Sequence, residues 1–303
     1  MSILKKTILL FSCLLMFSTV SHALTEITPS DVYRKTVEIS REVELIRKHF
    51  NSPKTVIPAR LGVYMRPRNT WLKSYEILVK INILRANNRL PRVAEVALQP
   101  LQDFDSALVY EQMIRVLAEL NIVKDRIGIR RQINPVKKQI GKTVTDNYHL
   151  LETISIQLDG IIGKSFTPSF VFAQNMRILE EVNTLLAELN IRDRTGPPNR
   201  IENIVPEDVF NIALQMLDEV KRLQRIAGIE SIDLSAIQKE NIAPKDVFRL
   251  TGLVLSELQP IKAYLRISKV TPPANIYHGK RPADAGQLMG WALRKIKKIR
   301  TLN

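Results

Sequence analysis

The chain contains few of the residues on which most enzymes and metal proteins depend. Among its 303 residues it has one cysteine, Cys13, and four histidines. It contains no His-Glu-x-x-His pair, no cysteine and histidine cluster with zinc-ligand spacing, and no Gly-x-Ser-x-Gly turn. We therefore expect no enzyme activity, no catalytic residues, no bound metal and no cofactor.

Long apolar runs are equally scarce. The clearest covers residues 7–20; two lysines precede it, and a short segment ending at Ala23 follows it. This order is typical of a secretory signal peptide. We predict that residues 1–23 are a leader cleaved after Ala23 and that the mature protein is periplasmic or secreted. A membrane-spanning first helix and lipidation at Cys13 are the alternatives. No later segment has the ~18 uncharged apolar residues of a transmembrane helix, so the mature chain is expected to have none.

Acidic residues are outnumbered, with 30 Asp and Glu against 45 Lys and Arg and a formal charge of +15. Removal of the leader takes away two lysines and no acid, which leaves +13. A positive field favours anionic partners and speeds their capture. Outside the cytoplasm we expect an anionic polysaccharide, an acidic envelope protein or an anionic membrane surface, and nucleic acid is disfavoured. The alternative is that the charge only keeps the protein soluble.

The chain does contain a repeat, whose first copy is Thr-Pro-Ser-Asp-Val-Tyr at residues 28–33. Each copy is interpreted as a helix start. Six of the eight copies have a proline at the first helical position, and five have an aspartate two residues later that can complete a capping box, whereas Asn69, Leu108 and Phe170 depart from this pattern. An apolar stripe at helical spacing follows, as after Phe210. Eight amphipathic helices of four to six turns, each with one buried stripe, are predicted. The copies begin at residues 28, 66, 105, 143, 167, 205, 243 and 281.

The spacing of the copies indicates a duplication. Successive prolines, or the residues in their place, are 38, 39, 38, 24, 38, 38 and 38 positions apart. The short step divides the series into two sets of four. We therefore predict an all-α protein in which a four-helix repeat module at residues 24–163 is followed by a second at residues 164–303, with a short turn between them. A continuous helical solenoid is the alternative.

The linkers between helices are long for a helix bundle, at roughly 15 to 20 residues. Such a linker can span the ~30 Å length of a 20-residue helix, so consecutive helices could run parallel. The clipped junction before Thr167 instead predicts that the fourth and fifth helices are antiparallel neighbours. Gly228, just past the end of the sixth helix, is predicted to terminate it in the left-handed conformation.

Basic residues concentrate in three blocks, residues 54–92, 124–142 and 294–300. We take the candidate contacts for an anionic partner from these blocks. The last block lies on a helix that could rest on an acidic membrane surface, although such a helix is more often the final member of a packed array. The candidates are Arg66, Arg68, Arg130, Arg131, Lys137, Lys138, Arg294, Lys295, Lys297 and Lys298.

An aromatic residue follows most helix starts, as at Tyr33, Trp71 and Phe248. These rings could line a groove that stacks on sugars or bases, but core anchoring is the preferred interpretation. The segment Gly141-Lys142-Thr143 resembles a fragment of a phosphate loop without its first glycine. It could seat an isolated anion at a helix N-terminus.

These features favour an exported, non-catalytic binding or scaffold protein that presents a basic surface to an anionic polymer or an acidic protein. The second hypothesis is a periplasmic small-molecule sensor or carrier, with a ligand site inside one helix bundle. Salt dependence separates the two, because polyelectrolyte binding weakens steeply with salt.

Overall fold

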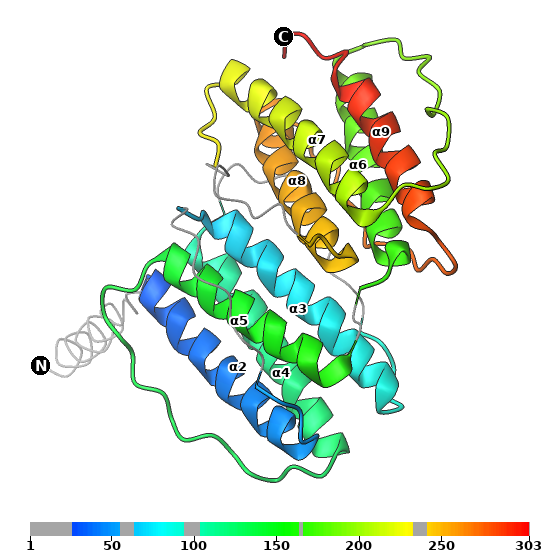
Figure 1. Ribbon diagram of the computed structural model, residues 1–303. Helices are drawn as coiled ribbons and strands as arrows, with labels where there is room; N and C mark the ends of the chain where they lie inside the picture. Colours follow the sequence, from blue (N-terminus) through cyan, green and yellow to red (C-terminus); the bar gives the residue numbers. More distant parts are fainter. Residues whose placement is uncertain (1–25, 55–63, 94–103, 164–165, 233–240, 303) are drawn as a thin grey trace, which may run out of the picture.

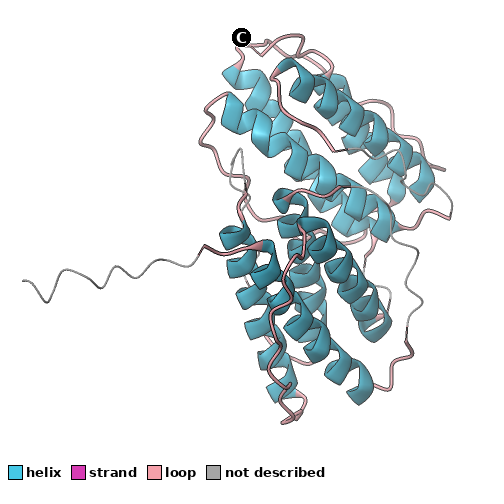
Figure 2. Cartoon of the chain, turned by 90° about the vertical axis from the view of Figure 1, so that its left-hand side faces the viewer, coloured by secondary structure: helices cyan, strands magenta, loops and turns pink. Residues whose placement is uncertain are grey.

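A computed structural model describes residues 26–54, 64–93, 104–163, 166–232 and 241–302. The described residues form helices and no sheet, which confirms the all-α prediction (Figures 1 and 2). The predicted leader, residues 1–23, lies outside this part of the chain. The helices are α2 (Pro29–His49), α3 (Pro67–Asn87), α4 (Ser106–Arg126), α5 (Val144–Ile162), α6 (Pro168–Glu188), α7 (Pro206–Ile226), α8 (Pro244–Tyr264) and α9 (Pro282–Ile296).

Each helix begins at its copy of the repeat, and the acid in the copy acts as predicted. The backbone N–H and the hydroxyl of Thr28 donate to the carboxylate of Asp31, at 3.0 and 2.7 Å. Asp208 accepts the backbone N–H of Val205 at 2.9 Å, although the valine cannot cap the helix itself. The acid therefore fixes the helix start even where the preceding residue has no capping group.

The four helices of each module run parallel (Figure 1). In the second module the first-turn prolines of all four helices, Pro168, Pro206, Pro244 and Pro282, surround one small apolar gap. In the first module the side-chain amide of Asn147 on α5 donates to the Pro29 carbonyl on α2, at 2.9 Å. The linkers therefore return along the outside of each bundle, as their length allows.

Helices adjacent in sequence are not always adjacent in space. In the first module α2 packs against α4 and α5, and α3 packs against the same two helices. The second module repeats this ring, with α6 and α7 each packed against α8 and α9. Each module closes into its own bundle, which is the predicted pair of four-helix modules and not a continuous solenoid.

The two modules point in opposite directions and meet along α3 and α8 (Figure 1). Arg68 near the start of α3 pairs with Glu257 late in α8, and Glu76 pairs with Arg249 at the start of α8. These pairs show that α3 and α8 are antiparallel. The helices α5 and α6 run in opposite directions, as predicted (Figure 1), but they have no packing contact among the described residues, so the prediction that they are neighbours is wrong. The short junction reverses the chain without bringing the two helices side by side.

The meeting of α3 and α8 also changes their burial. We expected one apolar stripe on each helix, but both helices are buried around most of their circumference. Each faces its own bundle on one side and the other module on the opposite side. Lys73 on α3 is buried where α3 and α5 meet the start of α8, whereas Lys80 is buried within its own bundle, against Ser155 and Asp159 of α5.

Candidate functional site: a basic groove and a cavity between the modules

Five of the ten predicted cationic residues already have anionic partners. Lys138 contacts Asp31 at 2.7 Å, and both Lys295 and Lys298 contact Asp193. Arg66 pairs with Glu230. The fifth, Arg68, is only 5% exposed and donates through Nε and Nη2 to the two oxygens of Glu257, at 2.9 and 2.7 Å. Arg68 is therefore a buried contact between modules and not part of an anion-binding surface.

The other five predicted residues are exposed and form no ion pair in the described part of the chain: Arg130, Arg131, Lys137, Arg294 and Lys297. They do not form one patch. The first three lie on the linker before α5, whereas the last two lie at the end of α9. The structure therefore divides the predicted basic surface into one region on each module.

The parallel bundles give a structural reason for basic residues at the helix ends. Four aligned helices place four partly negative C-terminal ends side by side, and nearby cations stabilise such ends by roughly 0.3–1 kcal/mol each. Arg294 and Lys297 occupy this position at the end of α9. The region on the second module is therefore explained by the bundle itself, and the linker of the first module is the better candidate for recognition.

A polar groove of about 620 Å³ lies beside that linker. It is bounded by α2, α5 and the linker, which runs back along α2 (Figure 1). Arg41, Lys54 and Arg131 line it, and Arg41 Nη1 holds the linker by donating to the Asn134 carbonyl at 3.0 Å. Among the described residues its one acidic lining side chain, Glu44, is already bound by Arg47 at 2.7 and 2.8 Å. The groove thus has an excess of positive charge.

The buried charges of α3 form a closed network. Glu76 contacts Lys73 at 2.8 Å, Lys80 at 3.3 Å and Arg249 of the other module at 3.3 Å. Burial alone would raise the pKa of Glu76, but these three cations hold it well below its usual value. Burial lowers the pKa of Lys80, against the opposing effect of Glu76 and Asp159. Because every member faces an opposite charge, the network joins the two modules through ion pairs.

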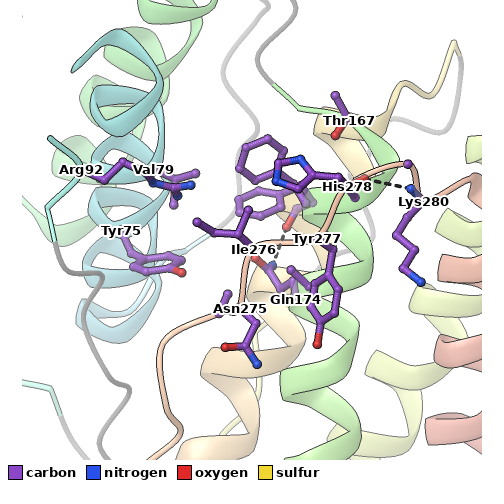
Figure 3. Close-up of a pocket in the computed structure, with 16 residues that line it drawn as sticks. Tyr75, Val79, Arg92, Thr167, Gln174, Asn275, Ile276, Tyr277, His278 and Lys280 are labelled. Carbon is purple, nitrogen blue, oxygen red and sulfur yellow. Dashed lines mark hydrogen bonds between the residues drawn. The ribbon is translucent and has the colours of Figure 1, made fainter. Parts of the chain in front are cut away.

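A cavity of about 480 Å³ lies where the modules meet (Figure 3). Tyr75 and Val79 of α3 form one wall, and Gln174 of α6 lies opposite them. The segment before α9 covers the remaining side with Ile276 and Tyr277. Further aromatic and polar residues line it as well: Phe170, Phe248, Arg92, Thr167, Ser169, Asn275, His278 and Lys280.

Two polar side chains are fixed around this cavity. The side-chain amide of Gln174 donates to the Phe248 carbonyl at 2.8 Å and to the Thr251 hydroxyl at 3.0 Å. Behind the wall, Nη1 of Arg177 donates to the hydroxyl of Tyr75 at 3.2 Å. Arg177 is 3% exposed, and its Nε and Nη2 have no hydrogen-bond partner among the residues that the structure describes. A buried guanidinium with two unsatisfied donors therefore lies next to the cavity.

Comparison of the chain with family models, with curated proteins and with solved structures finds no match. Among the described residues, no group of His, Cys, Asp and Glu side chains has the arrangement of a metal site. None of the described helices combines the length and the apolar character that a membrane span requires.

Sequence reasoning missed the cavity because its lining comes from segments far apart in the chain. One local feature distinguishes it. The first-module linker has Lys137, Lys138 and Ile140, whereas the matching positions 138 residues later are Asn275, Ile276 and His278. The lysines at positions 137 and 138 of the first linker are therefore replaced by an amide and an apolar side chain in the second.

The Gly-Lys pair at the end of each of these linkers has a structural role. The ammonium of Lys142 lies 4.6 Å from the centre of the Tyr33 ring, and that of Lys280 lies 4.5 Å from the Phe172 ring. The backbone N–H groups of the two lysines donate to Ser30 and Ser169. The segment resembling a phosphate loop is thus a duplicated anchor for the linker.

Proposed function

We propose that the protein is an exported, non-catalytic binding protein that holds an anionic polymer or an acidic protein partner in the groove of its first module. The anionic partner would be an envelope polysaccharide, an acidic envelope protein or an anionic membrane surface. Export rests on the predicted leader, and the absence of catalysis rests on the scarcity of cysteine and histidine. These parts of the proposal come from the sequence.

One observation carries the choice of site. Once every buried or paired cation is set aside, Arg130, Arg131 and Lys137 are exposed on the linker that borders the groove. Within the groove, the positive groups are Arg41, Lys54 and Arg131. A row of cations on an extended segment suits a ligand with repeated negative charges, because the contacts add without requiring a deep pocket.

Retention on immobilised anionic polymers tests the proposal. We expect the wild-type mature protein to bind at low salt and to be released as the salt concentration rises. Replacing both Arg131 and Lys137 with glutamate is expected to weaken binding about 10-fold to 100-fold and to make it less sensitive to salt. Lys138 is left unchanged because it is bound to Asp31 and its loss would perturb α2.

The matched control makes the same charge change on the other module, with Arg294→Glu and Lys297→Glu. This variant is expected to keep most of the binding because it leaves the groove intact. Equal loss in both variants would show that only net charge matters. Unchanged binding in the linker variant would overturn the groove as the site.

The second candidate function is the small-molecule sensor or carrier. The sequence placed its ligand inside one bundle, whereas the largely apolar cavity lies between the bundles. The cavity is the specific observation that favours this candidate.

A further inference from the structure

We propose that the cavity between the modules binds a small monoanion with an aromatic or alkyl body. This is a second binding function, separate from the basic groove and independent of whether the groove binds a polymer. The ligand class follows from the size of the cavity, its lining and the charges around it.

The size and the walls of the cavity suit a small organic molecule. Its volume of about 480 Å³ falls within the roughly 300–1,000 Å³ typical of ligand pockets. Four aromatic side chains face it, Tyr75, Phe170, Phe248 and Tyr277. The Phe248 ring is held firmly, since it stacks on Phe166 with 4.2 Å between centres. Rigid aromatic walls favour a flat ring or an alkyl chain over a highly hydrated sugar.

The charges around the cavity indicate a negative group on the ligand. Among the described residues no acidic side chain lines it, whereas Arg92, His278 and Lys280 do. The Lys280 ammonium makes no ion pair in the described part of the chain; it lies 4.5 Å from the Phe172 ring and 6.0 Å from the Tyr277 ring, and its charge helps to lower the pKa of Asp284. Arg177, with two unpaired donors, adds a buried positive charge behind Tyr75. A carboxylate or sulfonate would be favoured here by both charge and hydrogen bonding.

One exposed side chain supports the presence of a ligand. Ile276 lies at the cavity and is 58% exposed, although isoleucine is among the residues most often buried. At the matching position of the first module, Lys138 forms an ion pair with Asp31. The second module has therefore exchanged a paired surface cation for an apolar group beside the cavity. An apolar ligand would cover Ile276.

Calorimetry with three naphthalene probes of nearly equal size tests the inference on the full mature protein. The probes are 1-naphthoate, the neutral 1-naphthalenemethanol and the cationic 1-naphthylmethylamine. We expect 1-naphthoate to bind at least about tenfold more tightly than the neutral probe, since one charge-assisted contact has about that effect. The cationic probe is expected to bind most weakly. Bound 1-naphthoate should also raise the melting temperature, because both modules contribute walls.

Three variants locate the site. Ala173→Leu places three more carbon atoms in the cavity and is expected to weaken all probe binding about tenfold or more. Lys280→Gln is expected to weaken 1-naphthoate binding about fivefold to tenfold while leaving the neutral probe unchanged. The matched control is Lys142→Gln, which removes the equivalent lysine over Tyr33 in the first module and should change neither affinity.

The outcomes decide the inference. Binding that is weakened by Ala173→Leu and Lys280→Gln but not by Lys142→Gln supports it. Equal affinity for the anionic and neutral probes overturns the ligand class, and absence of binding at millimolar concentration overturns the site. If Ala173→Leu fails to fold, Lys280→Gln with its control decides alone, because Lys280 is partly exposed and its backbone bond is unaffected. Loss of polymer binding in the groove variants would not alter these results.

Discussion

The two modules place a buried glutamate at the same position but neutralise it in different ways. In the first module Glu119 of α4 pairs with Arg85 of α3 at 2.7 Å. The matching residues of the second module are Glu257 and Gln224, and Gln224 donates to the glutamate at 2.8 Å without supplying a charge. The missing cation is Arg68 from the other module. The second bundle therefore depends on the first for the neutrality of its own interior.

A second pair shows what both modules kept. Lys124 contacts Glu42 at 2.5 Å, and the matching Lys262 contacts Glu181 at 2.7 Å. Here each bundle neutralises its own charge with a lysine on its third helix and a glutamate on its first. After the duplication, the second module has kept the lysine–glutamate pair within its own bundle, whereas its other buried glutamate forms an ion pair with the first module.

The largest loss of stability is expected from removing the Arg68–Glu257 ion pair between the modules. Arg68→Met leaves the fully buried Glu257 without a cation, which should lower the free energy of unfolding by about 3–5 kcal/mol. Arg85→Met is expected to cost less, because Glu119 keeps a side-chain exposure of 11%. Urea denaturation of each variant measures the difference.

Adding Gln224→Arg to Arg68→Met sharpens this test. The new arginine stands where Arg85 stands in the first module, so it can pair with Glu257 as Arg85 pairs with Glu119. At least about 1 kcal/mol of the lost unfolding free energy should be recovered. A loss below about 1 kcal/mol for Arg68→Met itself, or no recovery with Gln224→Arg, would contradict the shared-charge account.

The retained pair should give a pH-dependent effect. Burial raises the pKa of Glu181 above its usual value, although Lys262 opposes this. The ionised form of Glu181 is thus disfavoured in the folded state, and its cost grows as the pH rises through the raised pKa. Lys262→Met removes the opposing charge, so its cost of about 3 kcal/mol at pH 7 should be smaller at pH 5.

The matched variant for this prediction is Lys124→Met in the first module, measured by denaturation at both pH values. Replacing both partners, with Lys262→Met and Glu181→Leu, is expected to restore most of the stability because no buried charge is left alone. A Lys262→Met variant that loses more stability at pH 5 than at pH 7 would reverse the predicted sign.

The smallest effect is expected at the helix ends, where the modules have exchanged arginine and glycine. Gly128 after α4 has a φ of 81°, and the matching Arg266 after α8 has a φ of 55°. Only glycine adopts this region without cost. Arg266→Gly should therefore stabilise the protein by about 0.5–1 kcal/mol, and Gly128→Arg should destabilise it by a similar amount, by thermal denaturation. Because no side chain lies within 4 Å of the Gly128 position, a much larger loss would point to a contact that the backbone argument omits.

The sequence predicted the features that are set locally. Helix starts depend on four or five consecutive residues, so the repeat located them all, and Gly228 has the predicted positive φ of 68°. The burial of Lys80 could not be predicted from its neighbours in the sequence. A lysine beside an apolar stripe normally faces water, but Lys80 is fully buried, and its ammonium is held by Ser155 and Asp159 of α5, more than 70 residues later in the chain. Asn69 has a similar explanation: it stands where other copies carry an acid, and its amide donates to Glu257 at 2.9 Å.

The candidate sites were predicted less well for the same reason. Arg131 and Lys137 are exposed, because a charge on an extended linker tends to stay in water, but their role in binding stays a prediction. Arg68 was misplaced because its partner is 189 residues away. The cavity combines α3, α6, α8 and a linker, and no pattern within any one of them encodes that meeting.

The ring order of the helices has a consequence for how the chain folds. Because α2 and α3 do not pack against each other, the first two helices cannot form a hairpin. Thr36 on α2 instead contacts Asn147 on α5, 111 residues later, so the first module closes only when its last helix arrives. Contacts between such distant residues slow folding, because a long loop must be ordered before they form. During synthesis from the N-terminus, the bundle of α2, α3 and α4 would therefore stay incomplete until α5 is made. Until then the apolar faces of these three helices would be exposed and accessible to chaperones.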